Sequence, residues 1–153
     1  MTMSQSLCKI YLHVIFHIKS TCQKIKEDDL NRLHAYIGQL VNGTGCQTIC
    51  VGGVDDHVHA LMLLSRNENV SHLVEEMKRN SSRWLKTLSK YYESFAWQGG
   101  YAVLSVSQSL VDRTRTYIEN QHTHHKTKSF EDEYIEFLKL YGIEYDERYV
   151  FND

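Results

Sequence analysis

The sequence predicts an α+β fold of the ferredoxin-like class, in which the order β-α-β-β-α-β gives a four-stranded antiparallel sheet with helices on one face. Three observations support this prediction. Segments rich in β-branched and aromatic residues alternate with segments whose apolar residues recur at helical spacing. The two central strand-like segments are joined by a short turn rich in glycine and aspartate, which favours antiparallel pairing. Further helical segments follow the fourth strand.

The first strand and helix are clear from their residue patterns. Residues 7–19 are rich in β-branched and aromatic residues with near alternation, which is typical of a strand covered on at least one side. Apolar residues over 30–41 recur at helical spacing, and the preceding Asp28 and Asp29 favour a helix start. Gly43 is placed to end this helix.

The central hairpin and the second helix follow. The apolar runs 46–51 and 57–64 are joined by the turn-forming segment 52–56, so they predict two antiparallel strands. Apolar residues from 70 to 88 mark one side of a long helix, for which Asn69 or Ser71 is available as a cap. The run 101–106 predicts the fourth strand.

Two further helices are predicted after the sheet. Ser109 with Asp112 resembles a capping box and opens a helix that carries an apolar side. Ser129 with Asp132 repeats this signal before an aromatic-rich helix that Gly142 is placed to end. The remaining C-terminal residues alternate charged and aromatic side chains, which predicts an arm that docks on another surface.

Length and charge limit the organisation and the partners. At 153 residues we expect one domain over 1–153, with a core at about 5–107, a helix at about 109–125 and a C-terminal helix and arm at about 129–153. Lys and Arg number 17 against 19 Asp and Glu, so the formal net charge is -2 and no global positive field attracts nucleic acid. Any such binding must use a local patch.

The cysteines and the N-terminus predict a cytoplasmic protein. Four cysteines occur in a chain without a signal-peptide pattern, which is typical of reduced cytosolic thiols. No window approaches the roughly 18 apolar residues of a membrane span. Cys46 and Cys50 could form half of a zinc site, but four residues along a strand span about 13 Å, which favours core thiols.

His57 and His59 form the most informative pair in the chain. Residues i and i+2 of a strand point the same way, so the two imidazoles converge on one face. Two such nitrogens bind a divalent ion weakly, and Gln121 is a candidate third ligand. A mixed site with an oxygen ligand and open positions suits Mg²⁺ or Mn²⁺ better than a closed structural zinc site. The alternative interpretation is two buried strand histidines with hydrogen-bonded rings.

Tyr117 lies four residues before Gln121 in a helix-like segment, so the two side chains are neighbours one turn apart. A tyrosine on an amphipathic helix is more often a packing residue. Its position beside a candidate ligand favours a second role, because a metal can neutralise a phosphodiester while the phenol attacks it. A phosphotyrosine would retain the energy of the broken bond, so that no nucleotide cofactor is needed.

Four segments together closely resemble the single-tyrosine HUH transposases of small bacterial insertion sequences, where HUH denotes histidine, hydrophobic, histidine. The resemblance covers nearly the whole chain, in order and at family spacing. Its segments are 54–59 (VDDHVH), 97–107 (WQGGYAVLSVS), 117–125 (YIENQHTHH) and 142–149 (GIEYDERY).

This resemblance implies a site and a reaction. His57, His59 and Gln121 would bind a divalent metal, Mg²⁺ or Mn²⁺, and Tyr117 would be the nucleophile. The enzyme would cleave single-stranded DNA at element ends, form a 5′-phosphotyrosine link with a free 3′ hydroxyl, and reverse the attack to join new ends.

The resemblance also implies partners and a location. These are single-stranded DNA with hairpin ends and a second copy of the chain, in the bacterial cytoplasm, with no membrane and no nucleotide cofactor. In that family the nucleophile's helix can be exchanged between subunits, and the segment 107–109 is the candidate linker here.

Two groups of basic residues are candidate DNA contacts. The first forms a stripe along the second predicted helix, and the second follows Gln121. Both are equally consistent with solvated surfaces. The stripe consists of Arg79, Arg83, Lys86 and Lys90, and the second group of His122, His124, His125, Lys126 and Lys128.

Three other functions remain open from the sequence. A non-catalytic nucleic-acid-binding module of ferredoxin-like fold would neither bind metal nor form an adduct with DNA. A metal-dependent nuclease that uses activated water would cleave DNA without a protein–DNA bond. A domesticated relative would keep the chemistry and process dispersed repeats.

Overall fold

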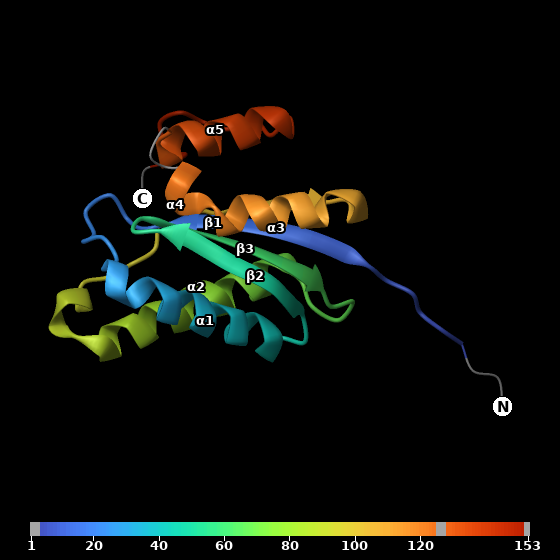
Figure 1. The fold of residues 1–153 in the computed structure, drawn as a ribbon, viewed down its shortest axis with the longest axis horizontal. Coiled ribbons are helices and arrows are strands. Elements are labelled where there is room, and N and C mark those ends of the chain that lie inside the picture. Colours follow the sequence, from blue (N-terminus) through green and yellow to red (C-terminus); the bar gives the residue numbers. More distant parts are fainter. Residues whose placement is uncertain (1–3, 125–127, 152–153) are drawn as a thin grey trace.

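The computed structural model of the protein describes residues 4–124 and 128–151, and a four-stranded antiparallel sheet runs through its centre (Figure 1). The strand order is β2-β3-β1-β4, with every neighbouring pair antiparallel. This is the order of the split β-α-β-β-α-β motif, so the predicted fold class is confirmed. The strands are β1 (Ile10–His17), β2 (Gln47–Val54), β3 (His57–Leu64) and β4 (Ala102–Val106).

Helices cover both faces of this sheet. The two helices of the split motif, α1 (Glu27–Gly43) and α2 (Val70–Leu88), lie together on one face. The C-terminal helices α3 (Val111–Glu119), α4 (Gln121–His124) and α5 (Phe130–Leu140) lie over the other face (Figure 1). Single turns of 3-10 helix at Lys90–Tyr92 and Gln108–Leu110 complete the described helical segments.

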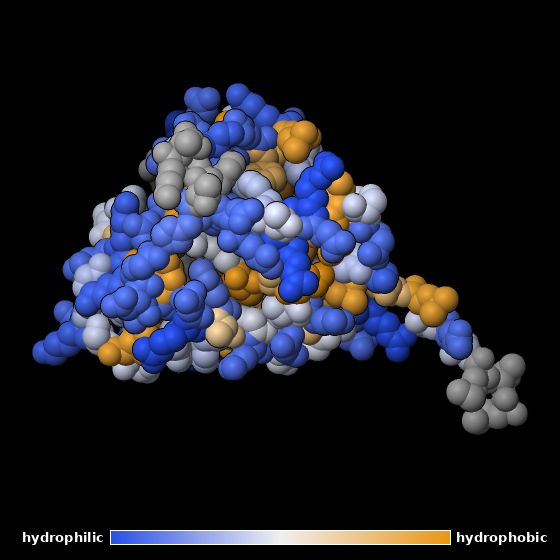
Figure 2. Space-filling model, viewed as in Figure 1, coloured by the Kyte–Doolittle hydropathy of each residue, from blue (hydrophilic) through white to orange (hydrophobic). Residues whose placement is uncertain are grey.

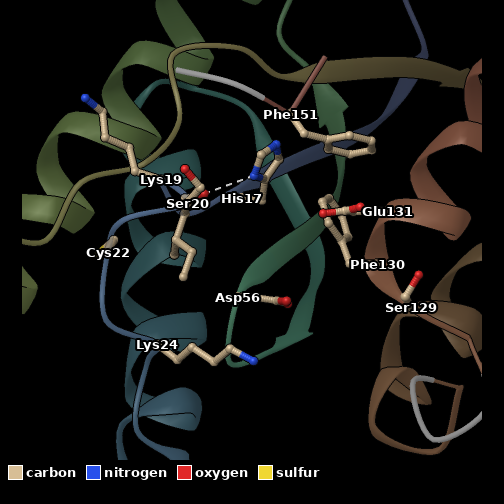
Figure 3. Close-up of a pocket in the computed structure, with 11 residues that line it drawn as sticks. His17, Lys19, Ser20, Cys22, Lys24, Asp56, Ser129, Phe130, Glu131 and Phe151 are labelled. Carbon is tan, nitrogen blue, oxygen red and sulfur yellow. Dashed lines mark hydrogen bonds between the residues drawn. The ribbon is translucent and has the colours of Figure 1, made fainter. Parts of the chain in front are cut away.

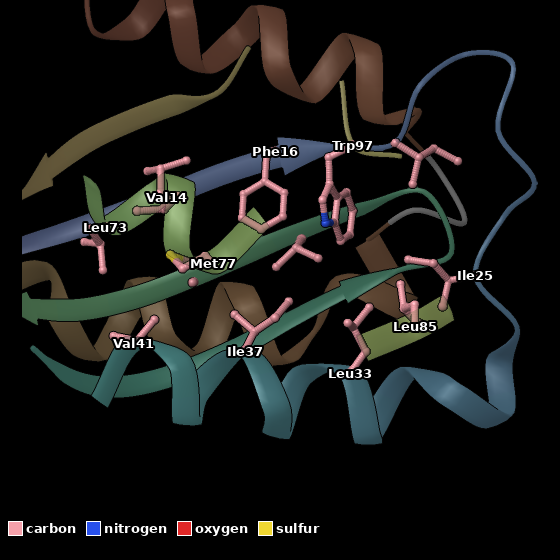
Figure 4. Packing of buried hydrophobic residues seen from close by; sticks show 14 of the residues in the cluster. Val14, Phe16, Ile25, Leu33, Ile37, Val41, Leu73, Met77, Leu85 and Trp97 are labelled. Carbon is pink, nitrogen blue, oxygen red and sulfur yellow. The ribbon is translucent and has the colours of Figure 1, made fainter. Parts of the chain in front are cut away.

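The face under α1 and α2 holds an apolar core. Alternate residues of β1, among them Val14 and Phe16, point into it and are 0% exposed. They meet one side of each helix, represented by Ile37 of α1 and Met77 of α2 (Figure 4). Trp97 closes the end of this core, and its ring packs edge-on against Phe16 with centroids 4.7 Å apart.

The opposite face is built differently, because half of the intervening residues of β1 and β3 are histidines. His13, His17, His57 and His59 are all buried there. The apolar residues on this face form two smaller clusters rather than one. One cluster is Ile15, Ala102, Leu104, Phe130, Tyr134 and Leu138, and the other is Leu61, Val106, Val111 and Ile118.

The central hairpin differs from its prediction in the length of the turn. Strand β2 continues to Val54, so only Asp55 and Asp56 connect β2 to β3. Gly52 and Gly53, which we predicted in the turn, pair instead with β3. Gly53 has a φ of 146°, and a Cβ there would lie 2.2 Å from the His57 carbonyl oxygen. Glycine is required at this position by backbone crowding within the strand rather than by a turn.

The predicted helix ends are partly confirmed. The Asn69 side chain caps α2 by accepting the His72 amide at 2.8 Å, and Ser129 caps α5 by accepting the Asp132 amide at 3.2 Å. Gly43 is the last residue of α1, but the positive φ that follows it, 90°, is at Gly45.

The helix expected at about 109–125 is wrong in two respects. Ser109 lies in a 3-10 turn, and α3 begins after Leu110 without a side-chain cap. The helix is then interrupted at Asn120, so Tyr117 belongs to α3 while Gln121 begins α4.

The face of the molecule seen in Figure 2 carries scattered hydrophobic side chains on a largely hydrophilic background. Among the described residues, no helix combines the length and the hydropathy that crossing a membrane requires.

Candidate active site

The two histidines of the HUH pattern lie side by side at the start of β3. In the register with β1, His57 is opposite His17 and His59 is opposite Ile15. Both imidazoles point toward the face covered by α3 and α5, and both side chains are 0% exposed. Strand alternation therefore brings them together as the sequence predicted.

The outward nitrogen of each imidazole is held by a hydrogen bond. His57 Nδ1 lies 2.7 Å from Asp56 Oδ1, and His59 Nδ1 lies 2.8 Å from His13 Nε2. These partners leave the Nε2 atom of both rings directed toward a common centre. Metal-binding histidines in proteins are commonly oriented in this way by a bond to the other ring nitrogen.

Gln121 contributes an amide oxygen to the same centre. Its Oε1 lies 2.9 Å from His57 Nε2, and its side chain is 1% exposed. The Nε2 of Gln121 also donates to the backbone oxygen of Tyr117 at 3.5 Å. The structure therefore brings the three predicted ligands together, although the break at Asn120 separates Gln121 from the helix of Tyr117.

A fourth group, Glu133 of α5, was missed by the sequence analysis. Its Oε1 lies 2.8 Å from His59 Nε2 and 4.0 Å from His57 Nε2, and the side chain is 2% exposed. A buried carboxylate is uncommon unless it has a partner. One signal was present in the sequence, because Glu133 shares a helix side with Phe130 and Phe137 and so interrupts an apolar stripe.

Tyr117 lies against this site in the same chain. Its ring centroid is 5.8 Å from that of His59 and 5.7 Å from that of Phe137. Its hydroxyl takes part in hydrogen bonds with Glu133 and Gln121. Burial, and next the hydrogen bond to the Glu133 carboxylate, raise the pKa of Tyr117. The phenol is therefore protonated in this arrangement.

The carboxylate of Glu133 is ionised. Burial by itself raises its pKa, but the hydrogen bond and charge of His59 outweigh burial, and the pKa of Glu133 falls to about 2. The pKa of His13 is lowered well below its ordinary value, chiefly by burial and next by the charge of His59. The site thus places an ionised carboxylate beside imidazole nitrogens and an amide oxygen.

The close approach of α3 to the sheet sets the position of Tyr117. Gly52 of β2 lies directly under α3, where a Cβ would meet the Ile118 carbonyl oxygen at 2.7 Å and the Ile118 side chain at 2.9 Å. Only a residue without a side chain allows this distance. Gly52 is also opposite His59 in the sheet, so the approach occurs beside the candidate ligands.

Helix α5 closes the other side of the site. The Phe130 ring stacks on the His57 ring with centroids 4.3 Å apart and planes inclined by 23°. Phe137 packs edge-on against His13, with centroids 5.4 Å apart. The histidines and Glu133 therefore lie in a closed layer between the sheet and α5.

The donor set fits a divalent cation. One possible ligand atom from each of His57, His59 and Glu133 lies within 4.8 Å of the other two. The oxygens of Gln121 and Glu133 lie 2.9 and 2.8 Å from the two histidine Nε2 atoms. Adjacent ligands of an octahedral Mg²⁺ with bonds of 2.0–2.1 Å are separated by roughly 2.9 Å, and a mixed nitrogen and oxygen set suits Mg²⁺ or Mn²⁺.

The predicted basic stripe lies away from this site. Helix α2 is on the opposite face of the sheet from the histidines (Figure 1). Arg79 bonds to Glu75 and Glu76 at 2.7 and 2.6 Å, so its charge is balanced locally. Arg83 and Lys86 are exposed on α2, whereas Lys90 begins the following 3-10 turn and is not on α2.

The second basic group is only partly described. His122 bonds to Glu27 at 2.7 Å, and Lys128 bonds to Glu136. His125 and Lys126 lie outside the described residues, as does the side chain of His124.

All four cysteines are free thiols, and Cys46 and Cys50 lie in packed positions, as predicted, whereas Cys8 is exposed. Cys46 is buried in the α1/α2 core, and Cys50 packs against the cluster under α3. Burial raises the pKa of the Cys50 thiol to about 11, so the thiolate is disfavoured.

Comparisons with known proteins agree with this arrangement. Residues 6–121 match the family described as "Transposase IS200 like". The ISDra2 transposase TnpA of Deinococcus radiodurans is 24% identical over 115 residues, which cover 72% of this chain and 82% of that protein.

Solved structures show the same fold. A crystal structure from Deinococcus radiodurans R1, described as a candidate transposase, superposes with a TM-score of 0.60 and 21% identity, covering 79% of this chain and 98% of that one. A REP-associated tyrosine transposase bound to a REP hairpin superposes with a TM-score of 0.55 and 10% identity, covering 85% of this chain and 76% of that one.

Proposed function

The chain belongs to the IS200-like transposase family, and from that premise we propose that it cleaves and rejoins single-stranded DNA through a covalent bond to Tyr117. The observation that carries this proposal is the convergence of Tyr117 with His57, His59 and Gln121, three donors that share one centre. A set of nitrogen and oxygen donors beside a phenol matches the needs of phosphodiester transfer.

We propose that His57, His59, Gln121 and Glu133 hold the divalent cation. When bound, that ion neutralises charge on the scissile phosphate and on the leaving oxygen. Asp56 and His13 keep both imidazoles turned inward, so the ligand geometry is set before DNA arrives.

In the proposed reaction, the Tyr117 hydroxyl oxygen forms a bond to phosphorus while the bond from phosphorus to the 3′ oxygen breaks. The tyrosine loses one proton and the leaving 3′ oxygen gains one, so the step is balanced. Attack by a 3′ hydroxyl on the phosphotyrosine reverses the step and joins two strands. Because the phosphotyrosine retains the energy of the broken bond, no nucleotide cofactor enters.

A REP hairpin is bound by one structural neighbour, and we propose that single-stranded DNA with hairpin ends is the substrate here as well. We also propose a homodimer. In the single chain described here Tyr117 lies beside its own histidines, which supports assembly of the site within one subunit.

The test is covalent trapping on a denaturing gel. Wild type and Tyr117→Phe are incubated with labelled single-stranded DNA from the regions flanking the gene, with Mn²⁺ or with EDTA. We expect a metal-dependent band of reduced mobility for wild type and none for Tyr117→Phe, because phenylalanine lacks the attacking oxygen. Tyr134→Phe is the matched control, since Tyr134 is buried on the same face without joining the donor cluster, and it should still form the adduct.

The other outcomes separate the alternatives. An adduct that survives Tyr117→Phe contradicts the proposal. Cleavage without an adduct indicates a nuclease that uses water, and binding without cleavage indicates a non-catalytic module. An adduct formed only with dispersed repeat DNA indicates a domesticated relative with the same chemistry.

A further inference from the structure

A cavity of about 340 Å³ lies next to the candidate active site, on the other side of Phe130. It opens between the end of β1, the turn before β3, the start of α5 and the C-terminal arm (Figure 3). Its volume is at the lower end of the roughly 300–1,000 Å³ of ordinary ligand sites. That space suits one small planar group and excludes a duplex.

One wall of this cavity is aromatic. Three rings from distant parts of the sequence meet there, namely His17, Phe130 and Phe151. Their centroids are 5.1 Å apart for His17 and Phe130, 5.9 Å for His17 and Phe151, and 6.4 Å for the two phenylalanines. His17 and Phe130 are each only 7% exposed, so the partly exposed Phe151 presents the most accessible ring. An accessible aromatic ring is the kind of surface on which unpaired nucleobases stack.

The rest of the lining is polar and mixes cations with carboxylates, namely Lys19 and Lys24 with Asp56 and Glu131. Figure 3 shows the Lys24 side chain reaching across the opening toward Asp56, whereas Lys19 points away. The Lys24 side chain is 65% exposed and lies only loosely beside Asp55, with a nitrogen–oxygen distance of 3.9 Å. An ammonium at the mouth of an aromatic pocket can bind the phosphate of a nucleotide whose base occupies the interior.

The cavity is directly connected to the site of chemistry. Phe130 forms its wall with one part of the ring and stacks on His57, 4.3 Å away, with another. Asp56 lines the cavity and also holds His57 Nδ1 at 2.7 Å. A strand whose scissile phosphate lies at the histidines therefore has a neighbouring nucleotide at this opening.

From this arrangement we infer that the cavity receives one unpaired nucleobase adjacent to the scissile phosphate, stacked on Phe151 with its phosphate near Lys24. The inference rests on the proposed function, because it takes the DNA strand to run past His57. It assigns to the C-terminal arm, through Phe151, a role in positioning the strand for attack.

The experiment uses the full chain and a set of single-stranded oligonucleotides from the regions flanking its gene. Each oligonucleotide carries one 2-aminopurine, whose fluorescence is quenched by stacking, at a different position around the cleaved phosphate. Adduct formation is measured with the same oligonucleotides. Wild type should quench one position next to the cleavage point more strongly than the others.

Two variants test the assignment. Phe151→Leu should remove that quenching and raise the DNA concentration for half-maximal adduct formation roughly 5- to 100-fold, which corresponds to the loss of one base stack. Lys24 is exposed, so Lys24→Ala should leave the fold intact. This variant should raise the DNA concentration for half-maximal adduct formation about two- to fivefold. The adduct yield at saturating DNA should not change in either variant.

Matched controls come from the same surfaces. Tyr149→Leu changes an exposed aromatic residue of the same arm, and Lys139→Ala removes an exposed lysine of α5 outside the cavity. Both should behave as wild type.

The failures of the two proposals are distinguishable. Adduct formation with no quenching that depends on Phe151 overturns the cavity assignment and leaves the proposed function standing. Quenching without any adduct overturns the proposed function, and with it the place of this base beside a scissile phosphate.

Discussion

The two faces of the sheet use the same strands for opposite purposes. Under α1 and α2, alternate residues of β1 such as Val14 and Phe16 join one continuous apolar core. Under α3 and α5, the intervening residues His13 and His17 are buried polar groups, and the apolar residues of this face form two smaller clusters. Strand alternation therefore lets one face supply stability while the other accepts buried polar groups. The difference teaches that burial alone does not identify a core position in this chain.

The largest effect on stability should come from the apolar face. Ile37→Ala should lower the free energy of unfolding by about 2–5 kcal/mol, because it removes buried methyl groups and leaves a cavity in the core. Urea denaturation measures this change. The milder Ile37→Val should cost about 0.5–1.5 kcal/mol. A loss below that range for Ile37→Ala would show that this face is not the main source of stability.

The polar face should gain stability from metal. At a free Mn²⁺ concentration about 100 times the dissociation constant, binding to the folded state adds about 3 kcal/mol to the free energy of unfolding. His57→Ala should abolish this gain, because it removes a central donor, and EDTA should reverse it in wild type. Thermal unfolding with and without Mn²⁺ measures the effect.

The control for this measurement is His72→Ala. His72 is exposed on α2 and bonds to Glu68, so its removal should leave the metal-dependent gain intact. A gain that survives His57→Ala, or disappears in His72→Ala, would contradict the division between the faces.

The smallest effect concerns His34 of α1. Burial, and next the charge of His57, lower the pKa of His34 to about 4, below its ordinary 6.5. The pKa of His34 is therefore lower in the folded state than in the unfolded state. The contribution of neutral His34 to the free energy of unfolding is fully present above about pH 6.5 and is lost as the pH falls toward 4. From about pH 7 to about pH 5 the loss should be at most about 2 kcal/mol.

His34→Gln should flatten this part of the stability curve, measured by urea denaturation at a series of pH values. His72→Gln is the control, because the pKa of His72 is raised by its bond to Glu68 rather than lowered. An unchanged slope in His34→Gln would show that protonation of His34 does not limit stability in acid.

Much of the site was predictable from the chain, and what was missed has physical reasons. His57 and His59 follow from strand periodicity, which is local. Glu133 is 74 residues from His59, and no local pattern reports a contact made through the docking of α5. The break at Asn120 was missed because the residues on either side of it are compatible with a continuous helix.

The glycines of the β2–β3 hairpin show the same limit of prediction from local sequence. Gly52 and Gly53 were assigned to the turn because glycine favours turns. Their actual roles are close approach to α3 and crowding against β3, and both depend on neighbours that are distant in the sequence or across the sheet.

The burial of the site has a consequence for how tightly DNA can be held. A phosphodiester cannot reach donor atoms that lie at 0–2% exposure, so the loaded molecule must differ from the closed one in how α3 and α5 cover the histidines. Where two such states exchange, the observed dissociation constant is the intrinsic constant divided by the open fraction. If about one molecule in a hundred were open, binding would be about a hundredfold weaker than at the open site. The affinity for DNA is therefore governed in part by packing contacts that need never touch the DNA.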